Sequence, residues 1–558
     1  MRTRLAFALT AFALAACSRS ETPAAGDAKG DTGGTLVIAT AGDADALLPP
    51  VITGVTGRQV ADQVFDRLAE IGPDLNTIGD EGFTPRLAKS WSWAPDSLSI
   101  AFALDPAARW HDGRPVRAGD VRFSFALIKD PKTGSTTTPL VANVDSVTVR
   151  DSLTPVFWFA TRSPEQFYDA TYQLYVVPEH VYGSVAHEAL KTADVARTPV
   201  GSGRFRFVRW DPGSRIELVA DTANYRGRAK LDRVIWTIAA DPQAALTRLQ
   251  AGEADFYELL LASQVADVTK GGTLRVLPYP ALQYAFMGMN QRARKGQGPH
   301  PVFGDPMVRR ALSMAVDRAG MLRNVYDSLG KPGRGPFPAA LGSADTTIAL
   351  PPFDTSAARA LLDSAGWRAG TDGVRRKGAT PLRFTILVPA SSTPRMRYAV
   401  LLQEQFKHVG AQVELEQVDF PTFLSRQGAH DFDAILAAIG TDPNPGGAKQ
   451  FWHSAAIGKG GSNDISYANP RVDALLDSAS ATYSASQAKR YMGEAYRQIV
   501  ADAPAIWLYD VATMGALHKR VHPAGLRADG WWADLPDWSI PAGERIARDQ
   551  AGLGAGNR

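Results

Sequence analysis

The chain has 558 residues, of which 45% are hydrophobic and 21% charged, and its 60 Lys and Arg nearly balance 57 Asp and Glu. This length exceeds one compact domain and indicates two or three. The near-neutral balance, with no long basic run in the sequence, argues against a nucleic-acid partner, because phosphate recognition needs a basic surplus or patch.

The N-terminus carries the pattern of an export signal. Arg2 and Arg4 precede a mostly apolar run, residues 5–16, and then Cys17, the only cysteine in the chain. A membrane span needs roughly 20 apolar residues, so this run is too short and instead predicts a secretory signal peptide at 1–16. An ordinary signal peptide followed by a chance cysteine remains open.

The junction itself, Leu14-Ala15-Ala16-Cys17, resembles the lipobox of bacterial lipoproteins. That resemblance implies cleavage before Cys17 and attachment of a lipid to its thiol. Residues 18–34 contain no large apolar side chain, so they cannot offset their ordering entropy, and we expect 17–34 to be a flexible tether. No later segment of the sequence approaches the length of a membrane span.

The predicted elements of the first half follow from hydrophobic periodicity and turn residues. We expect strands at 35–39, 98–104 and 234–238, a hairpin at 204–221, and helices at 58–70, at 120–127 with Asp120 as N-cap, and at 242–250 with Asp241 as N-cap. In the second half, 281–290 and 505–509 are apolar on both faces, which is typical of strands covered on both sides.

Helices are predicted at 306–326, 356–365, 395–409, 470–483 and 486–502, with strands at 384–388 and 413–416 between them. Strands alternating with helices predict an α/β architecture with mixed sheets. We find no internal repeat of solenoid length in the sequence.

Several segments in order along the chain carry a family resemblance. They lie at 87–131, 199–236, 249–256, 305–326, 463–479 and 502–510, and include LAKSWSWAPDSLSI, NDISYANPRVDALLDSA and DAPAIWLYD. With these segments the chain resembles the extracellular solute-binding proteins of ABC importers, family 5, the type that handles peptides and nickel.

The resemblance implies an α/β fold of the periplasmic-binding-protein-like type II, in which two lobes with mixed sheets close around a ligand. We place the two crossing strands at 281–290 and 505–511. Lobe one would hold 35–57, 199–280 and 505–558, with an accessory subdomain at 58–198, and lobe two would hold 291–504.

The resemblance also points to a ligand-binding carboxylate. Peptide-binding members place the aspartate of a Trp-x-x-Asp motif in lobe two against the peptide's α-ammonium. The matching aspartate is Asp442, whereas the tryptophan position holds Ile439. A desolvated cation needs such a countercharge, since burying it alone costs several kcal/mol. From the residues alone, Asp442 as the start of a turn at Pro443 remains open.

Four aromatic residues lie on or near the inferred cleft: Tyr284, Trp452, Trp507 and Tyr509. The resemblance implies that they line it, and core packing is the alternative for each. His111 beside Asp112 lacks companions for a metal site, and His518 and His522 are expected in a loop, so we predict no metal and no cofactor. The motifs G-x-S-x-G, H-E-x-x-H and G-x-x-x-x-G-K-[ST] do not occur, so we do not predict an enzyme.

The sequence therefore predicts a lipid-anchored, monomeric solute-binding protein on the periplasmic side of a bacterial membrane, which captures a small peptide and delivers it to an ABC permease. An opine, nickel chelate, haem or oligosaccharide as ligand remains open, as does a peptide sensor or chaperone without a permease.

The lipid anchor can be tested through Cys17. We expect Cys17→Ser to move the protein from the membrane fraction to the soluble fraction after cell lysis, because the substituted side chain has no thiol to acylate. Ser18→Ala, next to it, serves as the matched control and should stay with the membranes. Retention of the Cys17→Ser protein on membranes would contradict the prediction.

Overall fold

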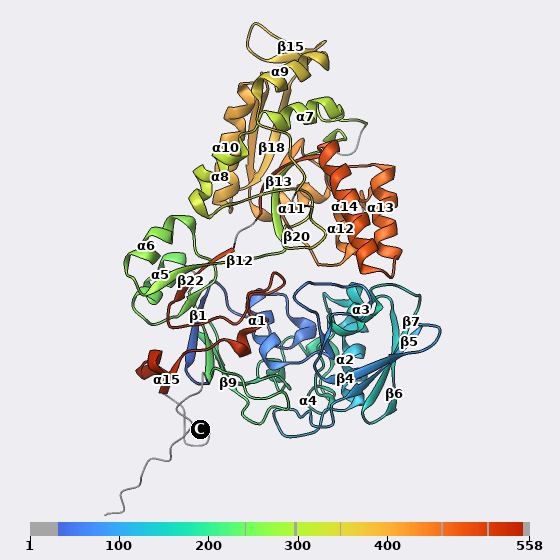
Figure 1. Ribbon diagram of the computed structural model, residues 1–558, viewed down its shortest axis with the longest axis vertical. Coiled ribbons are helices and arrows are strands. Elements are labelled where there is room, and N and C mark those ends of the chain that lie inside the picture. The colour runs from blue at the N-terminus through green and yellow to red at the C-terminus, as the bar shows by residue number, and fades with distance from the viewer. Residues whose placement is uncertain are drawn as a thin grey trace, which may run out of the picture.

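A computed structural model describes residues 32–239, 241–294, 298–345, 347–458, 461–510 and 513–550. It shows two bodies stacked along the long axis, which we call lobe one and lobe two (Figure 1). Lobe one is built on a seven-stranded sheet and lobe two on a six-stranded sheet. Within the described ranges, no helix combines the length and hydropathy that crossing a membrane requires. Cys17, the predicted signal peptide and most of the predicted tether lie outside these ranges.

The seven-stranded sheet of lobe one has the order β12-β22-β11-β1-β10-β9-β8. Its strands are β1 (Thr35–Thr40), β8 (Phe205–Asp211), β9 (Arg215–Ala220), β10 (Arg233–Ile238), β11 (Phe256–Tyr257), β12 (Leu274–Tyr279) and β22 (Thr513–His518). β1 is central and buried along its whole length, as its unbroken apolar and β-branched sequence predicts. The predicted hairpin is β8–β9, and Gly213 in its turn has a positive φ of 72°.

Helices α1 (Val55–Val64), α4 (Glu179–Tyr182), α5 (Pro242–Gln250), α6 (Val265–Lys270) and α15 (Ala547–Gln550) belong to lobe one. Asp241 caps α5 as predicted, since its carboxylate accepts a hydrogen bond from the Ala244 N–H at 3.0 Å. The predicted tether ends earlier than residue 34, because the Gly33 N–H donates to the Lys230 carbonyl at 2.6 Å.

A buried ion cluster holds the first strand to the C-terminal segment. The Arg520 guanidinium donates to Asp255 and to Asp549, each at 2.8 Å, and all three side chains are at most 4% exposed. The two carboxylates also accept backbone N–H groups of β1, Asp549 from Thr35 and Asp255 from Val37. Each charge in the cluster is therefore satisfied inside lobe one.

The accessory subdomain lies beside lobe one and has its own core. It contains β2 (Ala69–Glu70), β3 (Thr84–Pro85), β4 (Ala88–Trp93), β5 (Ser99–Leu104), β6 (Val144–Asp151), β7 (Thr154–Phe159), α2 (Ala118–Lys129) and α3 (Gln166–Thr171), with a four-stranded sheet in the order β4-β5-β7-β6. Its core comprises buried residues from Leu68 to Val176, joined by Leu282 and Leu341 of lobe two. The predicted bounds 58–198 were too wide, because α1 and the segment around Tyr182 pack in the core of lobe one.

The helix predicted from Asp120 begins earlier. Its N-cap is Arg117, and Asp120 lies in the first turn, where its carboxylate accepts the Arg117 N–H at 2.8 Å. A carboxylate three residues inside a helix can satisfy the cap residue's own N–H, so the same acidic residue fits either position by sequence.

Lobe two has the sheet order β14-β21-β13-β20-β18-β19. The strands are β13 (Gln283–Met289), β14 (Lys331–Pro332), β18 (Arg383–Pro389), β19 (Gln412–Val418), β20 (Ala434–Gly440) and β21 (Ala505–Asp510), and a small separate sheet holds β15 (Arg368–Ala369), β16 (Arg375–Lys377) and β17 (Thr380–Pro381). The helices are α7 (Pro306–Met314), α8 (Arg318–Tyr326), α9 (Thr355–Ser364), α10 (Thr393–Lys407), α11 (Phe420–Gly428), α12 (Pro445–Trp452), α13 (Pro470–Ala481) and α14 (Ala485–Asp502).

The single helix predicted over 306–326 is two helices. Asp317 separates them, because its carboxylate accepts the Gly320 N–H at 2.9 Å and so begins α8 as an N-cap. The apolar stripe continues across the break, which is why periodicity alone did not reveal it.

The chain passes between the sheets at the ends of neighbouring strands. β12 of lobe one leads into β13 of lobe two, and β21 of lobe two ends at Asp510 before β22 of lobe one begins at Thr513. β13 pairs with β21, and β12 pairs with β22. The predicted crossing strands, 281–290 and 505–511, therefore lie mostly inside the sheet of lobe two, and the passage itself occurs at their ends.

The ion cluster predicts the effect of removing its cation. Arg520→Met leaves Asp549 buried without its cation and Asp255 with the partly buried Arg548 alone, so we expect a loss of about 3–5 kcal/mol in the free energy of unfolding. Urea denaturation followed by tryptophan fluorescence measures it. Lys270→Met is the control, because Lys270 pairs with Asp267 at the surface and such pairs contribute less than about 1 kcal/mol. Equal losses in the two variants would contradict the prediction.

Candidate functional site

Asp442 lies at the seam between the lobes, in a loop that is held at both ends. β20 ends at Gly440, and the next N–H, of Thr441, donates to the Leu282 carbonyl at 2.9 Å. On the other side, the Asn444 side chain accepts the Gly447 N–H at 2.7 Å and caps α12, with Pro445 as its first residue. The sequence Asn-Pro thus begins a helix directly after the loop.

The side chain of Asp442 takes no part in building this loop. The cap is Asn444, and no side-chain hydrogen bond or ion pair joins the Asp442 carboxylate to any residue that the structure describes. The carboxylate is open to solvent but has protein on several sides, and the resulting desolvation raises its pKa. The positive charge of Arg58, on α1 of lobe one across the seam, acts to lower the pKa of Asp442. Asp442 is therefore a charge without a direct partner between two bodies.

The accessory subdomain presents a further carboxylate to this loop, with a second one beside it. Glu165 immediately precedes α3 and accepts the backbone N–H of Gly446, while its Oε1 is buried without a partner. Desolvation raises the pKa of Glu165 to about 7, and Asp442 adds to that effect. Desolvation, with Glu165 nearby, raises the pKa of Asp169 to about 8. Near pH 7 the protein therefore holds protons at this seam.

A cavity of about 530 Å³ opens next to Asp442, between the accessory subdomain and lobe two. One wall is the accessory loop 74–82, and the other comprises Leu341–Ser343, Pro443, Pro445 and the first turns of α14. Its lining mixes polar and apolar side chains. Volumes of 300–1,000 Å³ with this kind of lining are typical of small-molecule sites.

The four aromatic residues expected to line the cleft are in the core of lobe two instead. The exposed fractions are 2% for Tyr284, Trp452 and Trp507 and 4% for Tyr509. The Trp452 indole N–H lies 3.3 Å from the Tyr284 hydroxyl and 3.2 Å from the Pro336 carbonyl. Tyr284, Trp507 and Tyr509 lie on the internal strands β13 and β21, which helices of lobe two cover. Trp452, at the end of α12, packs against the Trp507 ring.

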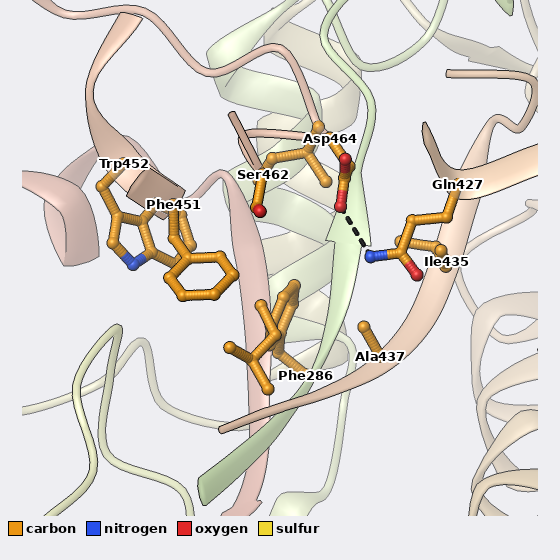
Figure 2. Close-up of a pocket in the computed structure, with 10 residues that line it drawn as sticks. Phe286, Gln427, Ile435, Ala437, Phe451, Trp452, Ser462 and Asp464 are labelled. Atoms are coloured by element: carbon orange, nitrogen blue, oxygen red, sulfur yellow. Dashed lines mark hydrogen bonds between the residues drawn. The ribbon is translucent and has the colours of Figure 1, made fainter. Parts of the chain in front are cut away.

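Trp452 does line a small cavity within lobe two, shown in Figure 2. Phe286 and Phe451 lie beside it, and the Gln427 amide donates to the Asp464 carboxylate at 2.6 Å. Its volume is about 10 Å³, room for one water molecule at most. This cavity cannot hold a solute in the described conformation.

Sequence reasoning found Asp442 but missed its neighbours across the seam, Arg58 and Glu165. A single charged residue in an ordinary amphipathic segment has no sequence pattern that would identify it as part of a binding site. Only the packing of α1 and α3 against the loop after β20 brings them near Asp442.

His111, which the sequence analysis did not assign to a metal site, is held by backbone hydrogen bonds. His111 contacts the backbone of Gly201 and Gly203, at 3.2 and 2.9 Å. Over the part of the chain that the structure describes, no three or more His, Cys, Asp or Glu side chains gather in a way that could hold a metal ion.

The raised pKa of Glu165 predicts a pH-dependent stability. The folded protein holds this proton more tightly than the unfolded chain, whose Glu pKa is about 4.3, so stability falls as pH rises from about 4.5 to about 7. A glutamine at position 165 can still accept the Gly446 N–H with its amide oxygen, but it cannot ionise. We therefore expect Glu165→Gln to melt at nearly the wild-type temperature at pH 4.5 and clearly above it at pH 8, in scanning calorimetry.

The control is Glu404→Gln, because Glu404 is an exposed carboxylate paired with Lys407. This substitution should not raise the melting temperature at pH 8. A Glu165→Gln protein that is no more stable than wild type at pH 8 would contradict the assignment of a desolvated carboxyl group.

Comparison with known proteins agrees with this architecture. The model for bacterial extracellular solute-binding proteins, family 5 Middle, matches residues 82–459. Protein XP55 of Streptomyces lividans is 30% identical over 89% of this chain and 86% of its own, and the oligopeptide-binding protein AppA of Bacillus subtilis is 27% identical over 89% and 90%. The structure of AppA in complex with a nonapeptide covers 92% of this chain and 100% of its own, with a TM-score of 0.71 and 24% identity. The predicted two-lobed α/β fold is thus confirmed, and the chain belongs to the bacterial extracellular solute-binding proteins, family 5.

Proposed function

We propose that this protein binds short peptides in the seam between its lobes and delivers them to an ABC importer. It acts as a monomer outside the cytoplasm, on the periplasmic side of a membrane, where a lipid on Cys17 anchors it. The relative named as an oligopeptide-binding protein, and its complex with a nonapeptide, support peptide as the ligand class. The observation that carries the proposal is the Asp442 carboxylate, which faces groups of lobe one and of the accessory subdomain without pairing to any of them.

An unpaired, desolvated carboxylate favours a cationic guest. Glu165 contacts the segment that follows Asp442, and the Asp442 charge raises the cost of ionising Glu165. A peptide's α-ammonium placed between them offsets that cost with hydrogen bonds and charge. Because it contacts both sides at once, such a ligand favours the closed arrangement over an open one.

We propose an indirect role for the four buried aromatic residues. Trp452 ends α12, the helix that begins directly after the Asp442 loop, and its ring is packed against Trp507 with the centroids 5.4 Å apart. Tyr284 on β13 pairs with Ile439 on β20, and Ile439 lies three residues before Asp442 in the chain. These rings hold the strand end and the helix between which Asp442 is presented, and they position the carboxylate without touching the ligand.

Native mass spectrometry of the protein purified from its own cells tests the ligand class. A mixture of adduct masses that fit short peptides is the expected result. One discrete mass that fits a nickel chelate, haem, an opine or an oligosaccharide would overturn peptide as the ligand, even though the family assignment would stand.

The role of Asp442 is tested by Asp442→Asn, measured by calorimetric titration with the released peptides or synthetic copies of them. We expect affinity to fall by about 2–5 kcal/mol, because the substitution removes the countercharge of the bound ammonium. N-acetylated copies, which lack that ammonium, should bind the variant and the wild type equally. Asp372→Asn is the matched control, because Asp372 lies in the small β15–β17 sheet region and pairs with Arg376. An unchanged affinity in Asp442→Asn would remove this residue from the site.

A further inference from the structure

The cavity of about 530 Å³ has charges of opposite sign on its opposite walls. Asp74 and Glu81 belong to the accessory loop, and Lys489 belongs to the second turn of α14 in lobe two. All three residues are exposed, and among the described residues no side-chain hydrogen bond or ion pair engages them. Elsewhere on α14, by contrast, Arg497 pairs with Asp345 at 3.0 Å. The cavity thus separates a cation from two carboxylates without allowing them to meet.

The accessory wall is held in one conformation. The indole N–H groups of Trp91 and Trp93 donate to Asp80 at 2.7 and 3.2 Å, which fixes the loop between Asp74 and Glu81. Leu75 in that loop has φ of 55°, a left-handed conformation that is uncommon for a leucine and costs free energy. Such strain is found at ligand sites more often than elsewhere, where it maintains a preformed shape.

The apolar part of the lining complements these charges. Leu75 and Ile78 lie on the accessory wall, and Met492 lies one turn beyond Lys489 on the opposite wall. A lysine or arginine side chain fits such surroundings, since its methylene stem packs on apolar groups while its cationic end reaches a carboxylate. Lys489, exposed on the opposite wall, can in addition bind an anionic group on the same ligand.

We propose that this cavity is the subsite for the C-terminal residue of the bound peptide and selects lysine or arginine there. Lys489 binds the terminal carboxylate, and Asp74 and Glu81 bind the side-chain cation. The inference rests on the proposed peptide-binding function and adds the ligand's orientation to it. Pro443 lines the cavity next to Asp442, so a peptide whose α-ammonium lies at Asp442 extends from there into the cavity.

Calorimetric titration with four synthetic peptides tests the subsite: Ala-Ala-Ala-Lys, Ala-Ala-Ala-Leu, Ala-Ala-Ala-Glu and the C-terminal amide of Ala-Ala-Ala-Lys. For the wild type we expect the lysine peptide to bind about tenfold more tightly than the leucine peptide, and the glutamate peptide to bind most weakly. The amide should bind about tenfold more weakly than the free acid.

Two variants test the roles of the two cavity walls separately. Lys489→Gln should bind the free acid and the amide equally while keeping the preference for lysine over leucine. The double variant Asp74→Asn, Glu81→Gln should lose the preference for lysine while keeping the difference between acid and amide. Arg490→Gln is the matched control, because Arg490 follows Lys489 on α14 but does not line the cavity.

The outcomes distinguish this inference from the function on which it rests. Equal affinities for all four peptides in the wild type would overturn the subsite and leave peptide binding in place. Identical behaviour of Lys489→Gln and Arg490→Gln would overturn the assignment of Lys489. Failure of all four peptides to bind, together with a non-peptide mass in the native spectrum, would overturn both proposals.

Discussion

The two sheets are joined where β13 and β21, neighbours in lobe two, continue toward β12 and β22, neighbours in lobe one. Both connections therefore start from adjacent strands of lobe two and end at adjacent strands of lobe one. Among the described residues, side chains and loops at the seam add further contacts between the bodies, such as Glu165 with Gly446 and Arg162 over the ring of Tyr483. The positions of the candidate ligand-binding groups at the seam depend on how these strands connect the two sheets.

The distribution of charge differs between the interior of each lobe and the seam. Inside lobe one, Arg520 compensates Asp255 and Asp549, and inside lobe two, Arg294 and His300 contact Asp433 and hold the pKa of that carboxyl well below its usual range. At the seam the pKa values of Asp442, Glu165 and Asp169 are raised instead. Opposing charges thus compensate these two clusters inside the lobes, whereas Glu258 and Asp464, also inside the lobes, and the seam carboxylates have raised pKa values.

Close packing gives the aromatic residues a different role from the one their positions suggested. A ring on an internal strand of a covered sheet is buried whatever the ligand, because helices pack on both faces. In the proposed function, Trp452 and Tyr284 contribute through the fixed position of the loop that they support. The walls of the cavity come instead from the accessory loop and from α14, segments with unremarkable sequence patterns.

The sequence alone predicted those elements that depend only on neighbouring residues in the chain. The β-branched run of β1, the turn at Gly213 and the capping of α5 by Asp241 all follow from neighbouring residues, and family resemblance supplied the two lobes and singled out Asp442. Tertiary structure alone decided that α1 packs with lobe one, that the predicted cleft aromatics are core, and that Glu165 lies at the Asp442 loop. The physical reason is that burial and desolvation depend on all the atoms around a group. For Asp442 and Glu165 those atoms include segments hundreds of residues away in the chain, and their approach is set by the packing of whole lobes.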